Sequence, residues 1–228
     1  LAFTTRPGPK VYIGRIDIVG NERTRDQVIR REMRLDEGEL YSATRLQRSR
    51  QRLTNLQFFE EVKIDTKRRG EEELMDLEVE VTERSTGQFT AGIGFSSIEN
   101  VVFTASVSQS NLFGRGQSIS LSARVGSLSQ DFTIDFQEPY LFGQPITGGV
   151  SVFRRSLDYD TFESRRTGVG LTIGRTLGEY ARASVTYNYE IVEIDDLDPG
   201  ASELLQQEEG TSYTSSLTPR IVWDSRDN

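Results

Sequence analysis

Residues from Gln88 onward alternate between apolar and polar side chains, and this period of two restricts the possible fold more than any other feature. In the first run one face carries Phe89, Ala91, Ile93 and Phe95, and the other carries Thr90, Gly92, Gly94 and Ser96. The runs that begin at Val101 and Ile119 repeat the pattern. Because the second face consists of Ser, Thr, Gly and charged residues, it suits a water-filled lumen better than a packed core. The alternation therefore predicts a transmembrane β-barrel.

Composition removes several classes of function. The chain contains no cysteine and no histidine, which excludes disulfides, thiol nucleophiles and the usual histidine base of hydrolases. No apolar run approaches the roughly 20 residues that a membrane-spanning helix needs. The formal net charge of −8 belongs entirely to residues 88–228, and an acidic chain is poorly suited to bind nucleic acid. We therefore expect a protein that is not an enzyme and has no cofactor, no metal site and no nucleic-acid partner.

Residues 11–84 show a different pattern, which predicts an α+β domain with the element order β-α-α-β-β. Thr24, with Gln27 three residues later, fits a capping box at the start of a short helix. The expected elements are a strand over 11–19, a helix from Thr24, a helix over 43–56, and strands over 60–65 and 74–81. Residues 1–10 read as a linker before this domain.

Residues 85–228 are expected to form an antiparallel transmembrane β-barrel portion of about eight strands, which fits the alternating segments of roughly 10 residues seen in such barrels. The expected strands are 88–96, 100–110, 116–126, 130–138, 145–156, 163–175, 180–193 and 211–223. The connections at about 157–162 and 194–210 are expected to be long outer loops, and those on the opposite side short turns. Short turns on one side and longer loops on the other are typical of outer-membrane barrels.

Two other patterns have simpler interpretations. The stretch 190–209 is rich in acidic residues and lacks Lys and Arg; its spacing fits no calcium-binding loop, so we interpret it as a solvated outer loop. The glycines at 168, 170 and 174 do not match a phosphate-binding fingerprint, because they lie within a predicted strand and not at a strand-to-helix turn.

Several short motifs resemble those of a known family. Three of them are Ile16-Asp17-Ile18-Val19-Gly20-Asn21, Arg30-Arg31-Glu32-Met33 and Leu56-Gln57-Phe58-Phe59, and two more are Asn111-Leu112-Phe113-Gly114-Arg115-Gly116 and Glu138-Pro139-Tyr140. In order and spacing the chain resembles the BamA-type outer-membrane protein assembly factors, the POTRA plus bacterial surface antigen barrel family. The resemblance implies a last POTRA domain in the periplasm, over 11–84, followed by the N-terminal half of a barrel in the bacterial outer membrane.

The resemblance also implies a function and its partners. Members of this family insert and fold outer-membrane proteins, so the expected partners are unfolded outer-membrane protein clients, periplasmic lipoproteins of the assembly complex and outer-membrane lipid. Two alternatives share the same architecture: the secretion pores of two-partner secretion and the barrel of the translocation-and-assembly module. A membrane hydrolase is a third alternative, but without histidine the usual catalytic triad cannot be built.

Three sites are expected from the resemblance and from the strand pattern. The first barrel strand would be a lateral gate that pairs with client strands, through Phe89, Thr90, Ala91, Gly92, Ile93, Gly94 and Phe95. An exposed patch of mixed charge would dock a lipoprotein, through Arg30, Arg31, Glu32 and Glu37. The strand over 60–65 would be a sheet edge that pairs with client segments, through Glu61, Val62, Lys63 and Ile64. The simpler interpretations are an ordinary first strand, a solvated helix face and a charge-protected edge.

Overall fold

The computed structural model describes residues 10–69, 73–178, 180–198, 200 and 206–225. The chain divides into two compact units, and we call unit 1 the residues up to Thr86 together with Phe113–Gly116, and unit 2 the remainder. Nearly all of the expected linker over 1–10 lies outside the described residues. Among the helices that the structure describes, none is long and apolar enough to cross a membrane.

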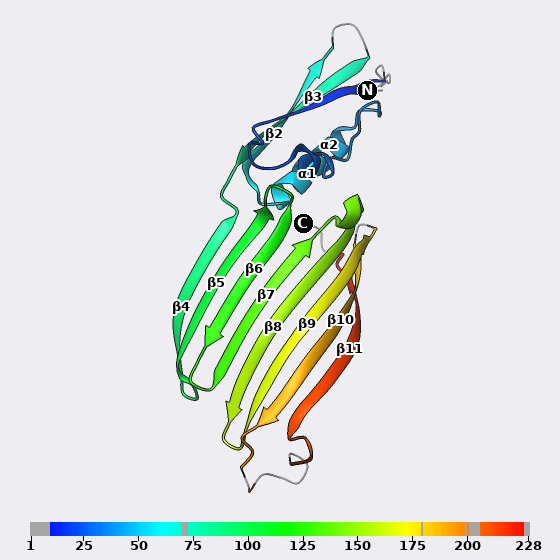
Figure 1. The fold of residues 1–228 in the computed structure, drawn as a ribbon. Coiled ribbons are helices and arrows are strands. Elements are labelled where there is room, and N and C mark those ends of the chain that lie inside the picture. Colours follow the sequence, from blue (N-terminus) through cyan, green and yellow to red (C-terminus); the bar gives the residue numbers. More distant parts are fainter. Residues whose placement is uncertain (1–9, 70–72, 179, 199, 201–205, 226–228) are drawn as a thin grey trace, which may run out of the picture. The chain divides into compact units, whose positions relative to one another are not determined.

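Unit 1 contains a three-stranded sheet and two helices (Figure 1). The elements in chain order are β1 (Tyr12–Val19), α1 (Asp26–Arg30), α2 (Ala43–Asn55), β2 (Phe59–Arg68) and β3 (Leu74–Glu83). The sheet order is β1-β3-β2, with β3 parallel to β1 and antiparallel to β2. Both β1 and β2 are therefore edge strands, and the expected order β-α-α-β-β is confirmed.

The core of unit 1 lies between the sheet and the helices. β3 turns Leu77, Val79 and Val81 inward at every second position, as the period of a half-buried strand requires. The other buried apolar residues are Ile13, Ile16, Val28, Ile29, Met33, Leu35, Leu53, Phe58, Phe59 and Val62. Thirteen buried side chains give this small domain one contiguous core.

The start of α2 agrees with the expectation from the sequence, whereas the start of α1 does not. α2 begins one residue after Ser42, whose side chain accepts a hydrogen bond from the Arg45 N–H, so the expected helix over 43–56 is confirmed to within one residue. The expected capping box at Thr24 is wrong. α1 begins at Asp26 with Arg25 at the N-cap and no side-chain cap, because the Thr24 N–H donates instead to Glu83 Oε1 at 2.6 Å.

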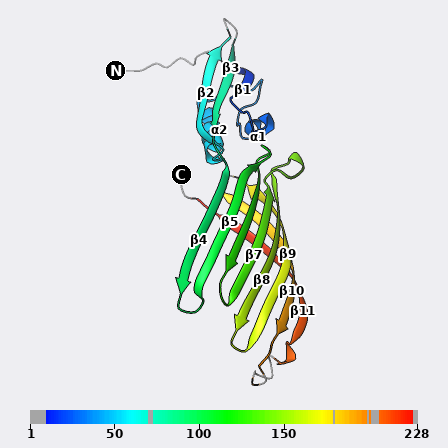
Figure 2. The ribbon, with the colours of Figure 1, turned by 60° about the vertical axis from the view of Figure 1, so that its left-hand side comes forward.

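Unit 2 is an eight-stranded antiparallel sheet in which each strand pairs with its neighbours in the sequence. Its strands are β4 (Gly87–Ser96), β5 (Asn100–Leu112), β6 (Gln117–Val125), β7 (Ser129–Glu138), β8 (Ile146–Tyr159), β9 (Phe162–Leu177), β10 (Ala181–Asp195) and β11 (Gly210–Trp223). The eight expected strands are confirmed. β4 and β11 lie at opposite ends of the sheet, as Figures 1 and 2 show.

One of the two expected long outer loops is wrong. Residues 157–162 do not form a loop, because β8 continues to Tyr159 and β9 begins at Phe162, with only two residues between them. The rings of Tyr159 and Phe162 stack at a centroid distance of 4.5 Å, and the two residues pair in the register of the sheet. The connection between β10 and β11 runs from residue 196 to 209, of which part is described.

The strand register separates an apolar and a polar face across unit 2. Residues that pair directly across strands share a face. One such row on the apolar face consists of Phe89, Val107, Leu121, Ile134, Val152 and Val169. The neighbouring row on the polar face begins with Thr90, Ser106, Ser122 and Thr133, which line a cavity of about 250 Å³. The alternation in the sequence therefore becomes two continuous surfaces of opposite character.

Candidate functional site

The free side of β4 is the first candidate site. In the described part of the chain, β4 pairs with β5 alone, so one row of its backbone N–H and C=O groups has no strand partner. All ten residues of β4 are exposed, including Phe89 at 70% and Phe95 at 84%. The expected gate residues 89–95 all lie within this strand. An edge of this kind is a ready template for pairing with another strand.

The glycines of β4 do not distort the strand. Its pairing with β5 runs without a shift from Gly87 opposite Gln109 to Ser96 opposite Asn100, so the glycines introduce no bulge. A Cβ at Gly94 would meet no heavy atom closer than 3.9 Å, and one at Gly92 would approach Thr104 Oγ1 at 3.0 Å. Because they lack side chains, Gly92 and Gly94 reduce the packing between β4 and β5 on the polar face.

The second candidate site is the edge strand β2. It pairs only with β3 within the described residues, and Glu61, Val62, Lys63 and Ile64 all lie within it. The Val62 side chain is buried in the core, whereas Glu61 and Lys63 form an exposed ion pair of 3.0 Å. Ion pairing raises the pKa of Lys63 above its ordinary value, chiefly through the hydrogen bond to Glu61. A strand that pairs with β2 would therefore bind to the β2 backbone beside the charged side chains of Glu61 and Lys63.

The expected docking patch is only partly exposed. Glu32 is 6% exposed, and its carboxylate forms an ion pair of 2.5 Å with Arg52 of α2. The Arg31 side chain is also mostly buried and lies 3.9 Å from Glu32. Arg30 and Glu37 remain half-exposed, with 3.6 Å between Arg30 Nη1 and Glu37 Oε1. The expectation of an exposed four-residue patch is therefore wrong for Glu32, which pairs with Arg52 of α2, and for Arg31, whose side chain is only 16% exposed.

Sequence reasoning missed two polar side chains that hold unit 1 together. The carboxylate of Glu83 accepts the N–H of Arg23 at 2.9 Å and that of Thr24 at 2.6 Å. Burial acts to raise the pKa of Glu83, but hydrogen bonds from Thr24 and Arg23 outweigh it and hold the pKa below its ordinary value. Ser49, fully buried in α2, accepts the Arg34 N–H at 2.7 Å. The only signal in the sequence is that Ser49 interrupts an apolar helix stripe.

The described residues also give a negative result for metal binding. Among the described residues, no group of three or more acidic side chains is arranged to hold a metal ion. Several charged groups of unit 1 pair with one another, as in the Arg15–Asp17 and Lys63–Glu61 contacts. Each of the two candidate sites is therefore a strand edge whose backbone N–H and C=O groups can bind another strand. At β4 this edge separates the apolar face of the sheet from the polar face.

Comparisons with known proteins agree with this geometry. The family described as "Omp85 superfamily domain" matches residues 111–228, and the POTRA family described as "Surface antigen variable number repeat" matches residues 11–84. The outer membrane protein assembly factor BamA of Nitratidesulfovibrio vulgaris is 28% identical over 228 residues, all of this chain and 29% of that protein. The factor of the same name from Neisseria meningitidis is 33% identical over 78% of this chain and 23% of its own length. The chain thus spans less than a third of these curated relatives.

A solved structure shows the same fold. BamA from Haemophilus ducreyi, in a crystal structure that lacks POTRA domains 1–3, superposes with a TM-score of 0.75 at 21% identity. The match covers 94% of this chain and 43% of that one. Because the chain matches the Omp85 and POTRA families and these outer membrane assembly factors, unit 2 lies in the outer membrane and the POTRA domain in the periplasm. The chain belongs to the Omp85 superfamily and, within it, to the non-enzymatic BamA-type outer-membrane protein assembly factors, of which it carries a POTRA domain and part of the barrel.

Proposed function

We propose that this chain is part of a machine that inserts and folds outer-membrane proteins, and that a client β-strand pairs with the free edge of β4 during insertion. The observation that carries the proposal is the exposed, singly paired β4. Main-chain hydrogen bonds do not depend on the client's side chains, so one edge can accept many sequences. This tolerance is what a general insertase requires.

The two faces of the sheet give the paired client strand its orientation. A strand added to β4 places alternate residues beside Phe89 on the apolar face and beside Thr90 on the polar face. A client with the alternation of an outer-membrane strand fits this template, because its apolar residues then face lipid and its polar residues face the lumen. A register slip of one residue would reverse both faces and is therefore disfavoured.

The POTRA domain would add two further contacts. Strand β2 would hold unfolded client segments by the same backbone pairing, at Glu61, Val62, Lys63 and Ile64. A periplasmic lipoprotein would dock beside α1, where Arg30 and Glu37 are accessible and Arg31 and Glu32 support the surface from within. An experiment for this docking is Arg30→Glu, which should weaken co-purification of the lipoprotein partners. Because Arg30 also binds the Ile16 carbonyl, far-ultraviolet circular dichroism checks that the domain stays folded, and unchanged co-purification of a folded variant would contradict the docking site.

The β4 proposal is tested by cysteine cross-linking in the full-length protein, since the chain itself has no cysteine. Thr90→Cys lies on the free edge strand, and Ser106→Cys lies directly opposite it on β5, which has a partner on both sides. A client with single cysteines along one strand should form disulfides with Thr90→Cys during insertion and not with Ser106→Cys. Equal adducts at both positions, or none with Thr90→Cys, would refute pairing at β4.

The alternative function is a passive secretion pore, as in two-partner secretion, and the polar face of unit 2 supports it. The row that begins with Thr90 and Ser106 would line a water-filled channel. Full-length protein in planar bilayers should then show steady, solute-selective conductance, whereas an insertase does not need it. A barrel of the translocation-and-assembly module would behave as an insertase in both experiments and differ in its client range.

A further inference from the structure

The outer edge of β1 is occupied along its first half by backbone hydrogen bonds. The N–H of Tyr41 donates to the carbonyl of Val11, and the N–H of Ile13 donates to the carbonyl of Glu39, both at 2.8 Å. The Gly38 N–H returns to the Ile13 carbonyl at 2.8 Å. Together with an antiparallel bridge between Tyr12 and Leu40, these bonds make residues 38–41 a short substitute for a neighbouring strand.

Beyond the part of β1 that residues 38–41 cover, two charged side chains bind its outer backbone. The N–H of Ile16 donates to Glu37 Oε1 at 3.0 Å, and the carbonyl of Ile16 accepts from Arg30 Nη2 at 2.9 Å. A carboxylate and a guanidinium thus occupy the donor and the acceptor that a paired strand would use at this residue. Hydrogen bonds to charged groups are stronger than those between neutral groups, so the edge is firmly closed at Ile16.

Asp26 and Glu37 both contact the Arg30 side chain, and a cavity lies beside Ile16. Asp26 Oδ2 binds Arg30 Nε at 2.7 Å one helical turn earlier in α1, and Arg30 Nη1 lies 3.6 Å from Glu37. A cavity of about 260 Å³ is lined by Ile16, Arg30, Met33, Leu35, Asp36 and Glu37. Because space remains beside Ile16, removal of the two side chains would uncover its backbone and would not be compensated by packing.

The other edge of the sheet has no such cover. In the described part of the chain, no side chain or segment bonds the outer backbone of β2 over Glu61–Ile64. The charged side chains of this stretch bond one another or stand in solvent. The sheet therefore has one closed and one open edge.

We propose that Arg30 and Glu37 determine which edge of the POTRA sheet accepts a client strand, by acting as a side-chain substitute for a strand beside β1. The inference rests on the proposed strand pairing at β2. Edge strands are liable to unwanted pairing, and inward-directed charges are a known means of preventing it. With β1 closed, a client segment has only the β2 edge of this sheet to join, which fixes the side of the domain on which the segment binds.

Peptide cross-linking to the full-length protein tests the inference. The probe is a ten-residue peptide with the sequence of Gly87–Ser96 and cysteine in place of Thr90. Reporter cysteines are Val19→Cys on β1 and Lys63→Cys on β2, each in three backgrounds. These are the unaltered protein, the double variant Arg30→Met/Glu37→Leu, and the matched control Arg15→Met/Asp17→Leu. The control removes an exposed β1 ion pair of 2.7 Å and keeps both side chains that bond the Ile16 backbone.

The expected result is an adduct at Lys63→Cys in all three backgrounds and an adduct at Val19→Cys only in Arg30→Met/Glu37→Leu. The gain at Val19→Cys should be about ten-fold or more, the change in equilibrium expected for removing one hydrogen bond to a charged group. Far-ultraviolet circular dichroism of each variant checks that the domain is folded, since an unfolded chain would expose both reporter cysteines. If Val19→Cys reacts in the unaltered protein, or stays unreactive in the double variant while β2 reacts, the inference fails. If Lys63→Cys does not react in the unaltered protein, the proposed pairing at β2 fails instead.

Discussion

At the scale of single residues, Gly20 and Gly38 share a backbone conformation and differ in their surroundings. Both have a φ of +87°, but a Cβ at Gly20 would lie 2.1 Å from the Val81 carbonyl oxygen, whereas one at Gly38 meets nothing within 4 Å. We expect Gly38→Ala to lower the free energy of unfolding by about 1 kcal/mol, the strain of a left-handed alanine. Gly20→Ala should cost roughly 1–3 kcal/mol more, since the β1 and β3 backbones must move apart. Urea unfolding of the two variants measures the difference, and equal midpoints would contradict it.

The pH dependence of unit 1 is expected to depend on Glu83. Its pKa lies below the ordinary value of 4.5 in the folded state, so the ionised carboxylate stabilises the fold above that pH. The stabilisation is lost as the pH falls through the lowered pKa, because protonation then weakens the bonds from Arg23 and Thr24. Glu83→Gln should lower stability at neutral pH by about 1–3 kcal/mol, since an amide has one acceptor oxygen for two N–H groups.

Urea midpoints of the unaltered protein and of Glu83→Gln, followed by far-ultraviolet circular dichroism from about pH 3 to pH 7, test this expectation. The difference between the two proteins should shrink on the acid side of the ordinary glutamate pKa. A difference that is constant across this range would show that the charge of Glu83 contributes nothing to the fold.

At the scale of the element, α2 depends on a hydroxyl in its apolar stripe. Ser49 Oγ accepts the Arg34 N–H at 2.7 Å and donates to the Arg45 carbonyl at 2.9 Å. Ser49→Ala leaves the Arg34 N–H without this acceptor and should cost about 1–3 kcal/mol in urea unfolding. The matched control is Thr54→Ala, whose hydroxyl bonds the Arg50 carbonyl in the same way but is exposed. Similar effects of the two substitutions would argue against the Arg34 contact as the cause.

The same elements show what could be predicted from the sequence. Strand bounds in unit 2 and the bounds of α2 follow from periodicity and from a local cap, which are properties of neighbouring residues. The start of α1 could not be predicted this way, because Glu83 lies 59 residues from Thr24 in the sequence and still takes its N–H. The burial of Glu32 beside Arg52, 20 residues away, escaped prediction for the same reason. Local patterns identify the candidate edges β2 and β4, whereas the closure of β1 depends on contacts between distant residues.

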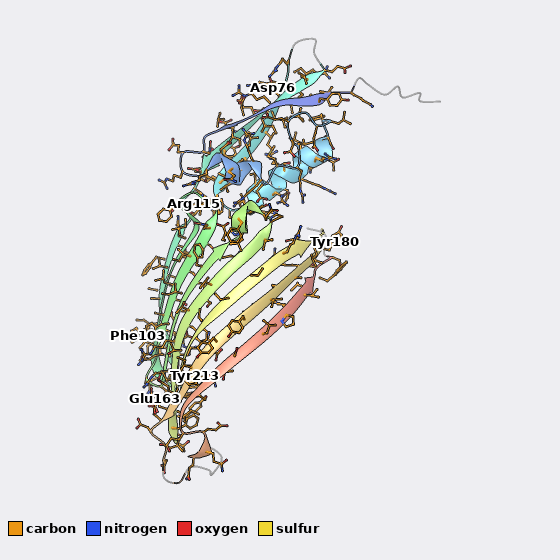
Figure 3. The ribbon with its side chains drawn as sticks, turned by 45° about the vertical axis from the view of Figure 1, so that its right-hand side comes forward. Asp76, Phe103, Arg115, Glu163, Tyr180 and Tyr213 are labelled. Atoms are coloured by element: carbon orange, nitrogen blue, oxygen red, sulfur yellow. The ribbon has the colours of Figure 1, made fainter. Side chains whose placement is uncertain are left out.

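At the scale of the whole molecule, aromatic side chains mark two levels on the apolar face of unit 2. Trp223 and Tyr180 lie together at one end of β10 and β11, with ring centroids 6.4 Å apart. Tyr189 and Tyr213 stack at 6.5 Å farther along the same strands. Figure 3 labels Tyr180 and Tyr213, which lie toward opposite ends of the sheet. Trp223 and Tyr213 are ten positions apart in β11, about 33 Å along a strand. At a tilt of about 40° this is a height of roughly 25 Å, the thickness of the apolar band of outer-membrane barrels.

The two faces of unit 2 predict opposite responses to the same substitution at adjacent positions. Leu121 lies in the middle of β6 on the apolar face, opposite Ile134, and Ser120 lies on the polar face, opposite Asp135. Leu121→Arg would place a charge in lipid and should cost about 2–4 kcal/mol, whereas Ser120→Arg gains an oppositely charged neighbour in a hydrated space and should be close to neutral. The amount of folded full-length protein in the outer membrane, and its urea midpoint in detergent, should both fall only for Leu121→Arg. If Ser120→Arg were the more harmful of the two, the assignment of the lipid and lumen faces would be reversed.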